Sequence, residues 1–274
     1  MLKQRIITAV VLAPLALAAI FLLPLFEFKL FAAVVVSLAA WEWANLSGME
    51  QSSQRVGYAA IVLALIMLLQ WFAVAAMPLL IAALMFWLVA FVWVCRYPAS
   101  LGQWQRVPVR ALIGLLVLLP TWSGLVELKS QPSANAWLLL VMLLVWGADV
   151  GAYFSGRKWG NKKLAVAVSP GKTWAGFYGG LASSMLIALL FGLSVSLTTT
   201  QLVALLLVCL VTALVSVLGD LLESMIKRHR GIKDSSNLLP GHGGVMDRVD
   251  SLTAAVPVFA LGLLLSGLAG VAVI

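Results

Sequence analysis

Three polar clusters interrupt a chain in which 63% of all residues are hydrophobic. The richest is GIKDSSNLLPGHGGVMDRVD, residues 231–250, which combines basic residues, a histidine between glycines and three aspartates. Carboxylates suit a hard divalent cation such as Mg²⁺, whereas cations and glycine-rich backbone suit phosphate groups. The combination favours phosphoryl or nucleotidyl transfer, in which positioning and charge neutralisation do most of the work.

This cluster begins on the preceding helix. Asp220, Glu223 and Lys227 are spaced to share one helical face. Asp247 and Asp250 are three residues apart and share a face if the next helix begins early. Surface salt bridges would explain the charges, but not the glycines or the position of Asp220 at the end of an apolar helix.

A second cluster is WGADVGAYFSGRKWG, residues 146–160. Asp149 and Tyr153 are four apart and share a helical face. Glycines 147, 151 and 156 allow close approach by a neighbouring helix or a ligand. The alternative is that this cluster only packs helices together and that Asp149 is hydrogen-bonded within the protein. Burying a carboxylate near lipid costs free energy, which favours a functional role.

The third cluster is SPGKTWAGFYGG, residues 169–180. We expect Ser169 to Gly171 to form a turn and Lys172-Thr173 to precede a helix whose free N–H groups suit phosphate. Gly171-Lys172-Thr173 is not the end of a P-loop, because that motif needs a glycine where Val166 stands and a preceding strand, which we do not expect.

The elements that position these clusters are apolar helices. Only 10% of the 274 residues are charged and the mean hydropathy is +1.07, which is typical of a membrane protein. Runs long enough to span a bilayer predict an all-α, polytopic protein with about nine transmembrane helices. They cover residues 6–25, 29–47, 56–76, 78–95, 109–126, 136–155, 175–196, 201–223 and 251–273. The first run is too long for a signal peptide and is expected to be retained.

The basic residues orient this arrangement. With nine spans, every lysine and arginine except Lys29 and Lys129 falls on the side of the N-terminus. Basic residues in short loops stay in the cytosol, so the N-terminus and all three clusters are expected there. Residues 1–135 form nearly featureless helices, interpreted as a scaffold with dimer or lipid contacts. Residues 136–274 are interpreted as the catalytic region. Glu42 has two interpretations that the sequence does not separate: a functional carboxylate, or a residue at the membrane interface.

The residues of the three clusters resemble a known signature. Ser224-Met-Ile-Lys-Arg228, Lys233-Asp234 and PGHGGVMDRVD (240–250) are similar to the phosphatidate cytidylyltransferases, or CDP-diacylglycerol synthases. The Ser169 to Gly176 segment and the Asp149-x-x-Ala-Tyr153 segment match as well. The first 135 residues match only as hydrophobic helices. The chain departs at Ala175, where many members carry an acidic or amide residue.

The resemblance implies that CTP and phosphatidate give CDP-diacylglycerol and pyrophosphate. It also implies Mg²⁺, a homodimer and the inner (cytoplasmic) membrane, with a site facing the cytosol; no nucleic-acid partner is expected. In family terms Asp220 and Asp247 are the principal metal ligands, and each ends or begins a helix on the cytosolic face. Asp149 and Asp250 are candidates for support or for a second metal ion.

The remaining roles complete this hypothesis. The CTP phosphates are assigned to Ser169, Lys172, Thr173, Lys233, His242, Gly243 and Gly244. The lipid phosphate is assigned to Arg228 or Arg248, and catalysis to Asp220, Asp247, Lys227 and Arg248. A phosphomonoester has a second pKa of about 6, so the lipid phosphate attacks the α-phosphorus without a strong general base.

Two other classes stay open. A CTP-dependent lipid kinase of the polyprenol type would use similar groups but release CDP and a phosphorylated alcohol. A secondary transporter would use Asp149 and Asp220 for ions or protons. Transporters often show paired repeats and midplane sites, whereas the polar residues here gather at one face.

Overall fold

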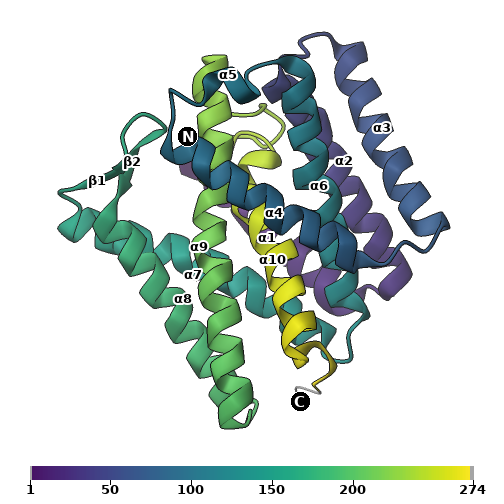
Figure 1. Cartoon of the computed structure of the whole chain (residues 1–274), viewed down its shortest axis with the longest axis vertical. Coiled ribbons are helices and arrows are strands. Elements are labelled where there is room, and N and C mark those ends of the chain that lie inside the picture. The colour runs from purple at the N-terminus through teal and green to yellow at the C-terminus, as the bar shows by residue number, and fades with distance from the viewer. Residues whose placement is uncertain (1, 272–274) are drawn as a thin grey trace.

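The computed structural model describes residues 2–271 of the chain and, within them, all side chains except those of residues 2–7 and 9. The fold is a bundle of long helices, as Figure 1 shows. They are α1 (Leu2–Leu22), α2 (Leu25–Ser47), α3 (Ser52–Trp71), α4 (Ala76–Cys95), α6 (Val107–Ser130), α7 (Ala134–Trp159), α8 (Trp174–Ser194), α9 (Thr199–Arg230) and α10 (Met246–Ser266). A short α5 (Leu101–Trp104), a hairpin of β1 (Lys163–Ala165) and β2 (Ser169–Thr173), and a 3₁₀ turn, η1 (Leu268–Gly270), complete the described elements.

The membrane character of the fold follows from these helices. Between residues 2 and 271, seven helices are long and apolar enough to cross a bilayer: α3, α4, α6, α7, α8, α9 and α10. They correspond to the last seven spans predicted from the sequence, so the all-α membrane class is confirmed. Helices α1 and α2 coincide with the first two predicted spans but lie outside this set of seven.

Two helices differ from the predicted spans where they meet the polar segment 231–245. Helix α9 extends to Arg230, so its last turn is basic, which complements the partial negative charge of a helix C-terminus. It ends at Gly231, whose φ of 68° is left-handed. Helix α10 begins at Met246, earlier than residue 251. The early start puts Asp247 and Asp250 in one helix, which was the condition for their sharing a face.

The hairpin corrects the expectation for residues 169–173. Ser169 to Gly171 lie in strand β2 and not in a turn, because Lys163 pairs with Thr173 and Ala165 with Ser169. Thr173 then caps α8 by accepting a hydrogen bond from the Gly176 amide at 3.1 Å. A P-loop is still excluded by Val166, which stands where that motif requires a glycine. The hairpin is not part of the apolar helices. Unpaired backbone groups at the edges of its strands are tolerated only where they are not exposed to lipid.

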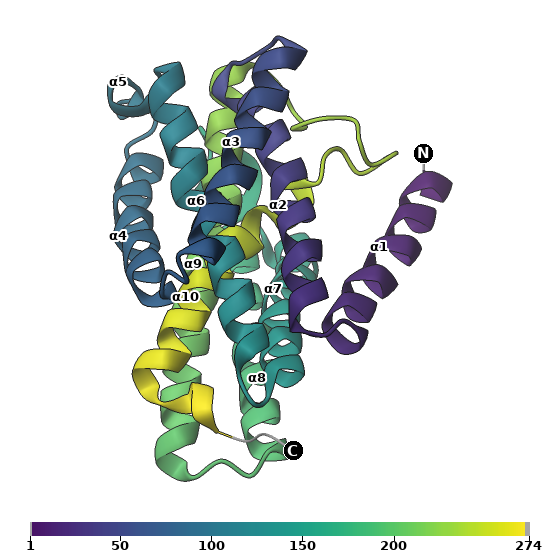
Figure 2. The ribbon, with the colours of Figure 1, turned by 90° about the vertical axis from the view of Figure 1, so that its right-hand side faces the viewer.

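Helix α10 forms the centre of the bundle and packs against α9, α6 and α4. Every residue of this helix from Ser251 to Leu261 is buried. Helices α7 and α8 make the most extensive helix pair in the bundle. Helix α1 lies at the side of the molecule, where it contacts α7 and α2 (Figure 2).

The polar segments gather at one end of the bundle. In Figure 2, α5, the α2–α3 connection and the segment between α9 and α10 lie at the upper end. The α8–α9 connection and the end of the chain lie at the lower end (Figures 1 and 2). The hairpin is also in the upper half of the molecule (Figure 1). The fold therefore brings the three polar clusters of the sequence to the same end.

Candidate functional site

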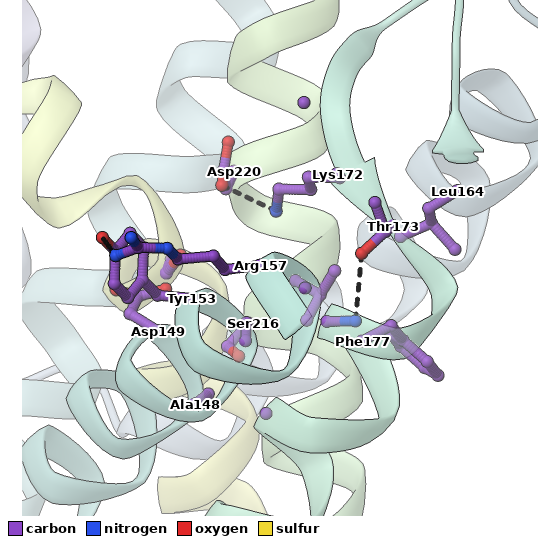
Figure 3. A pocket seen from close by; sticks show the side chains of 17 residues that line it. Ala148, Asp149, Tyr153, Arg157, Leu164, Lys172, Thr173, Phe177, Ser216 and Asp220 are labelled. Atoms are coloured by element: carbon purple, nitrogen blue, oxygen red, sulfur yellow. Dashed lines mark hydrogen bonds and ion pairs between the residues drawn. The ribbon is translucent and has the colours of Figure 1, made fainter. Parts of the chain in front are cut away.

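A cavity of about 440 Å³ opens where α7, α8, α9, α10 and the hairpin meet. Its polar lining consists of Asp149, Tyr153, Arg157, Lys172, Thr173, Ser216, Asp220 and Ser251. Figure 3 shows the labelled side chains around this space, with Lys172 and Asp220 pointing toward one another. The cavity thus joins the 146–160 cluster, the 169–180 cluster and the start of the 219–250 cluster.

Close contact between α7 and α8 builds one wall of the cavity. A methyl group on Gly180 would lie 2.7 Å from the Ala148 carbonyl oxygen, and one on Gly176 would lie 3.0 Å from the Ala152 oxygen. Neither position admits a larger residue unless the helices separate. This packing fixes Asp149 and Tyr153 of α7 opposite Thr173 at the start of α8. On the α7 side, a methyl group on Gly151 would lie 2.6 Å from the Gly179 carbonyl oxygen, so the close approach of a neighbouring helix predicted at this glycine is confirmed.

The charged contact at the cavity is an ion pair. The Lys172 ammonium lies 2.6 Å from Asp220 Oδ2, and the two side chains are 26% and 29% exposed. The Ser224 hydroxyl donates to Asp220 Oδ1 at 3.1 Å. In the first turn of α8 the Gly176 amide donates to Thr173 and the Trp174 amide donates to the Lys162 carbonyl, so the positive group on this side of the cavity is the Lys172 ammonium. An anionic ligand would find positive groups here, and Asp220 would be able to exchange its lysine for another cation.

A second polar network lies at the start of α10. Lys227 Nζ donates to Asp247 Oδ1 at 2.7 Å and to Glu223 Oε2 at 2.9 Å. Asp247 Oδ2 accepts from the Ser235 amide and hydroxyl, both at 2.9 Å, and from the Gly244 amide at 2.7 Å. Asp247 therefore receives four donors and ties the segment 231–245 to α9.

The predicted residues fall into two zones. Asp149, Lys172, Thr173 and Asp220 line the cavity. Lys227, Gly244 and Asp247 belong to the network at α10, where the Asp250 carboxyl faces Glu223. Arg248, exposed on α10, is within electrostatic range of Asp149.

The other predicted residues lie further from the cavity. Arg228 donates to the Val168 carbonyl of the hairpin at 3.3 Å, and Ser169 is in β2. Lys233 is exposed, while the Gly243 backbone bridges to Leu239 beside His242. The structure thus brings four of the predicted residues to one cavity and arranges the rest around it.

Sequence reasoning missed several lining residues and underrated one buried carboxylate. Arg157 and Ser216 line the cavity, and only their helical spacing from Tyr153 and Asp220 could have indicated them. Glu42, left open above, is completely buried and accepts hydrogen bonds from the segment 235–246. Its partners are almost 200 residues away in the chain, so no local pattern could identify them.

Several carboxylates lie close together between α9 and α10, where a divalent cation could bind. Glu223 Oε1 is buried without a hydrogen-bond partner, and the Asp250 carboxyl faces both Glu223 and Asp220. Because the Glu223 and Asp250 carboxyls contact each other, the pair requires either a shared proton or a cation, and a divalent cation fits this carboxylate group. No group of three or more acidic, histidine or cysteine side chains among the described residues already surrounds a common metal position. Asp220 fits best, because it borders both the cavity and this carboxylate group.

The fold and the site define a class: a polytopic helical membrane protein with a phosphate-compatible cavity at one polar end. Comparison with known proteins then gives the family. The profile of the family described as "Cytidylyltransferase family" matches residues 3–266. The chain belongs to this family.

Named relatives cover almost the whole chain. A phosphatidate cytidylyltransferase of Pseudomonas aeruginosa is 55% identical over 260 residues, which are 95% of this chain and 96% of the relative. A Haemophilus influenzae protein of the same name is 39% identical, over 95% of this chain and 98% of its own length. One from Staphylococcus epidermidis is 38% identical over 129 residues, about half of each chain.

Proposed function

We propose that the protein transfers CMP from CTP to phosphatidate, giving CDP-diacylglycerol and pyrophosphate for phospholipid biosynthesis. The observation that carries this proposal is the cavity that joins Lys172, Thr173, Asp149 and Asp220 at the polar end of a membrane bundle. The relatives named phosphatidate cytidylyltransferase, at up to 55% identity over 95% of the chain, support the same activity.

The triphosphate of CTP is assigned to the cavity. Lys172 supplies one cation, and Arg157 adds a second cation at the rim. The lipid phosphate is assigned to Arg228 of α9 or Arg248 of α10, which are exposed on two of the helices that line the cavity. Ser169, Lys233, His242 and Gly243 remain candidates for outer contacts to CTP. Lys227 and Gly244 act through Asp247.

The reaction is an in-line displacement. A phosphate oxygen of phosphatidate forms a bond to the α-phosphorus of CTP, the bond to the β-phosphate breaks, and pyrophosphate leaves. The attacking group is already anionic near neutral pH, because a phosphomonoester has a second pKa of about 6. The basic residues around the cavity therefore serve mainly to reduce repulsion between two anions and to align them.

Mg²⁺ is the cofactor that we assign to this site. Asp220 would hold the ion, and Asp149 is the second carboxylate that lines the cavity. Asp250, which is within electrostatic range of Asp220, is a further candidate. The same three carboxylates are the candidates for binding a second ion. Asp247 is the other ligand inferred from the family signature, although its oxygens accept four protein donors here. The ion supplies neutralisation of phosphate charge when bound.

The membrane arrangement is part of the proposal. Helices α1 and α2 join the seven membrane-compatible helices to give nine crossings, with the N-terminus and the cavity on the cytosolic side of the inner membrane. The gathering of basic segments at one end supports this orientation. Residues 1–135 serve as scaffold, with lipid contacts and a homodimer contact, and residues 136–274 carry catalysis.

A reconstitution assay tests the function. Purified protein in detergent receives CTP, phosphatidate and Mg²⁺, and both pyrophosphate and CDP-lipid are measured, with EDTA as a control. We expect equal amounts of both products and none with EDTA. CDP together with a phosphorylated alcohol would instead identify a lipid kinase, and ion flux in proteoliposomes without any CTP dependence would identify a transporter.

A further inference from the structure

We infer that Glu42, on α2 in the N-terminal half of the chain, is a positioning residue for the transfer reaction. It would hold residues 235–246 and the start of α10 in the arrangement that the site requires. The inference rests on the proposed function, but it concerns a residue outside the family signature and outside the cavity. It gives the N-terminal half a direct part in the site.

The geometry around Glu42 is unusually complete. Its Oε1 accepts from the Ser236 hydroxyl at 2.6 Å and from the Val245 amide at 2.9 Å. Its Oε2 accepts from the Met246 amide at 2.6 Å and from the Ser235 hydroxyl at 3.1 Å. The side chain is 0% exposed. A carboxylate so deeply buried is tolerated only because four donors surround it.

These donors include backbone groups that the helix itself cannot satisfy. The first amides of a helix lack intrahelical acceptors and favour a negative charge. At the start of α10 the Gly244 amide donates to Asp247, while the next two amides donate to Glu42. The Ser235 hydroxyl lies within hydrogen-bond distance of both carboxylates. Glu42 and Asp247 therefore act as a pair on one helix start.

Two further observations point to the same contact. A methyl group on Gly244 would lie 2.5 Å from each Glu42 oxygen, so a glycine at this position lets the segment reach the carboxylate. Asn45, one turn after Glu42, donates from Nδ2 to the Ser235 carbonyl at 2.9 Å. The end of α2 thus holds the segment 235–246 through more than one side chain.

The network connects Glu42 to the cavity. Ser235 links Glu42 to Asp247, Lys227 links Asp247 to Glu223, and Glu223 lies one turn after Asp220 on α9. Loss of the Glu42 carboxylate would remove the contacts that hold Ser235 and the start of α10, and so would allow Asp247, Lys227 and Glu223 to shift. Displacements of about 1 Å in a reacting site can lower turnover by about 100-fold.

The test compares Glu42→Gln with Glu27→Gln, the same substitution at an exposed position of α2. Glutamine keeps the size of glutamate but turns an NH₂ group toward two of the four donors. We expect Glu42→Gln to lower kcat by about 10- to 100-fold with the KM for CTP little changed. The unfolding temperature should also fall, because charge-assisted hydrogen bonds to a buried carboxylate are lost. Glu27→Gln should match the wild type.

Hydrogen exchange gives a readout that is independent of activity. In the substrate-free protein, Glu42→Gln should speed exchange of amides 235–247 while leaving α7 and α8 unchanged. Wild-type kcat in a folded Glu42→Gln protein would overturn the inference. So would a loss of kcat that merely parallels a global rise in exchange, because that pattern marks a structural role.

A second variant covers the case in which Glu42→Gln does not fold. Ser235→Ala removes the hydroxyl shared by the two carboxylates and leaves both carboxylates in place. It should reproduce the local exchange and a loss of kcat, whereas full activity would overturn the inference. Absence of CDP-lipid in the wild type and in Glu27→Gln would reject the proposed function, and with it a role for Glu42 in that reaction. The exchange data would still report whether Glu42 holds the segment.

Discussion

Asp220 and Asp247 carry the same side chain in different surroundings. Asp220 is 29% exposed at the cavity and has Lys172 and Ser224 as partners. Asp247 is 4% exposed in its side chain and accepts four donors. The first is available to a ligand, whereas the second is a structural centre of the segment 231–250. Their neutral variants should therefore differ in stability, although both should be inactive.

The first prediction is that Asp220→Asn loses at least about 100-fold in kcat, because the carboxylate proposed to hold Mg²⁺ beside the phosphates is removed. Its unfolding temperature should hardly change, since a partly exposed ion pair contributes only about 0–1 kcal/mol. Asp247→Asn should lose activity and also about 2–3 kcal/mol of stability, because charge-assisted hydrogen bonds are broken. Kinetics and thermal unfolding of both variants check this.

Glu50→Gln is the control for this comparison, because Glu50 is an exposed carboxylate paired with Arg230 away from the cavity. It should retain full kcat. Substantial activity in Asp220→Asn would remove that residue from the site. Equal stabilities for Asp220→Asn and Asp247→Asn would contradict the structural role assigned to the four donors.

Single residues also mark the limit of prediction from sequence. Lys172, Thr173, Asp149 and Asp220 could be predicted because their types and local spacing indicate phosphate chemistry. Glu42 could not, since its role depends on Ser235 and Met246, which only the tertiary fold brings near. The ion pair of Lys172 with Asp220 is a contact of the same kind.

At the scale of elements, long apolar runs predicted nine spans, and seven of them correspond to membrane-compatible helices, because hydrophobic length is a strong and local signal. The hairpin was missed. Its strands have three and five residues, and each is defined by the other and by Thr173 at the start of α8. Such short strands carry no periodicity that could be read from the chain alone.

The second prediction concerns the α7–α8 pair, the wall of the cavity. Gly180→Val should lower both kcat and thermal stability, the latter by about 1–3 kcal/mol, because the side chain would be forced against the Ala148 carbonyl. The helices would have to separate, which would displace Asp149 from Thr173. Activity assays and thermal unfolding measure the two effects.

Gly57→Ala is a matched control, because nothing lies within 4 Å of a methyl group at Gly57 on α3. It should keep full activity and gain slightly in stability, since alanine is a better helix former than glycine. A fully active and stable Gly180→Val would show that the wall can open without affecting the site.

At the scale of the whole molecule, the bundle separates its ends by chemistry. The segments that connect α2 to α3, α4 to α6, α7 to α8 and α9 to α10, taken together with the helical turns that flank them, carry 14 of the 18 lysine and arginine residues. The opposite connections carry few. A membrane would keep the basic end in the cytosol, where CTP is available, while phosphatidate could reach the cavity laterally from the bilayer.

The last prediction tests this arrangement by cysteine labelling in oriented membrane vesicles. Cys95 and Cys209 are first replaced, and single cysteines are placed at Gln4, Gln105, Thr199 and Ser266. With nine crossings, an impermeant thiol reagent should reach Gln4→Cys and Gln105→Cys only from the cytosolic face. Thr199→Cys and Ser266→Cys should react only from the opposite face, because they lie at the other ends of α9 and α10. Labelling of Gln4→Cys from the outer face would mean that α1 does not cross in the proposed sense. Labelling of Gln105→Cys from that face would place the cavity on the wrong side for cytosolic CTP and would overturn the proposed orientation.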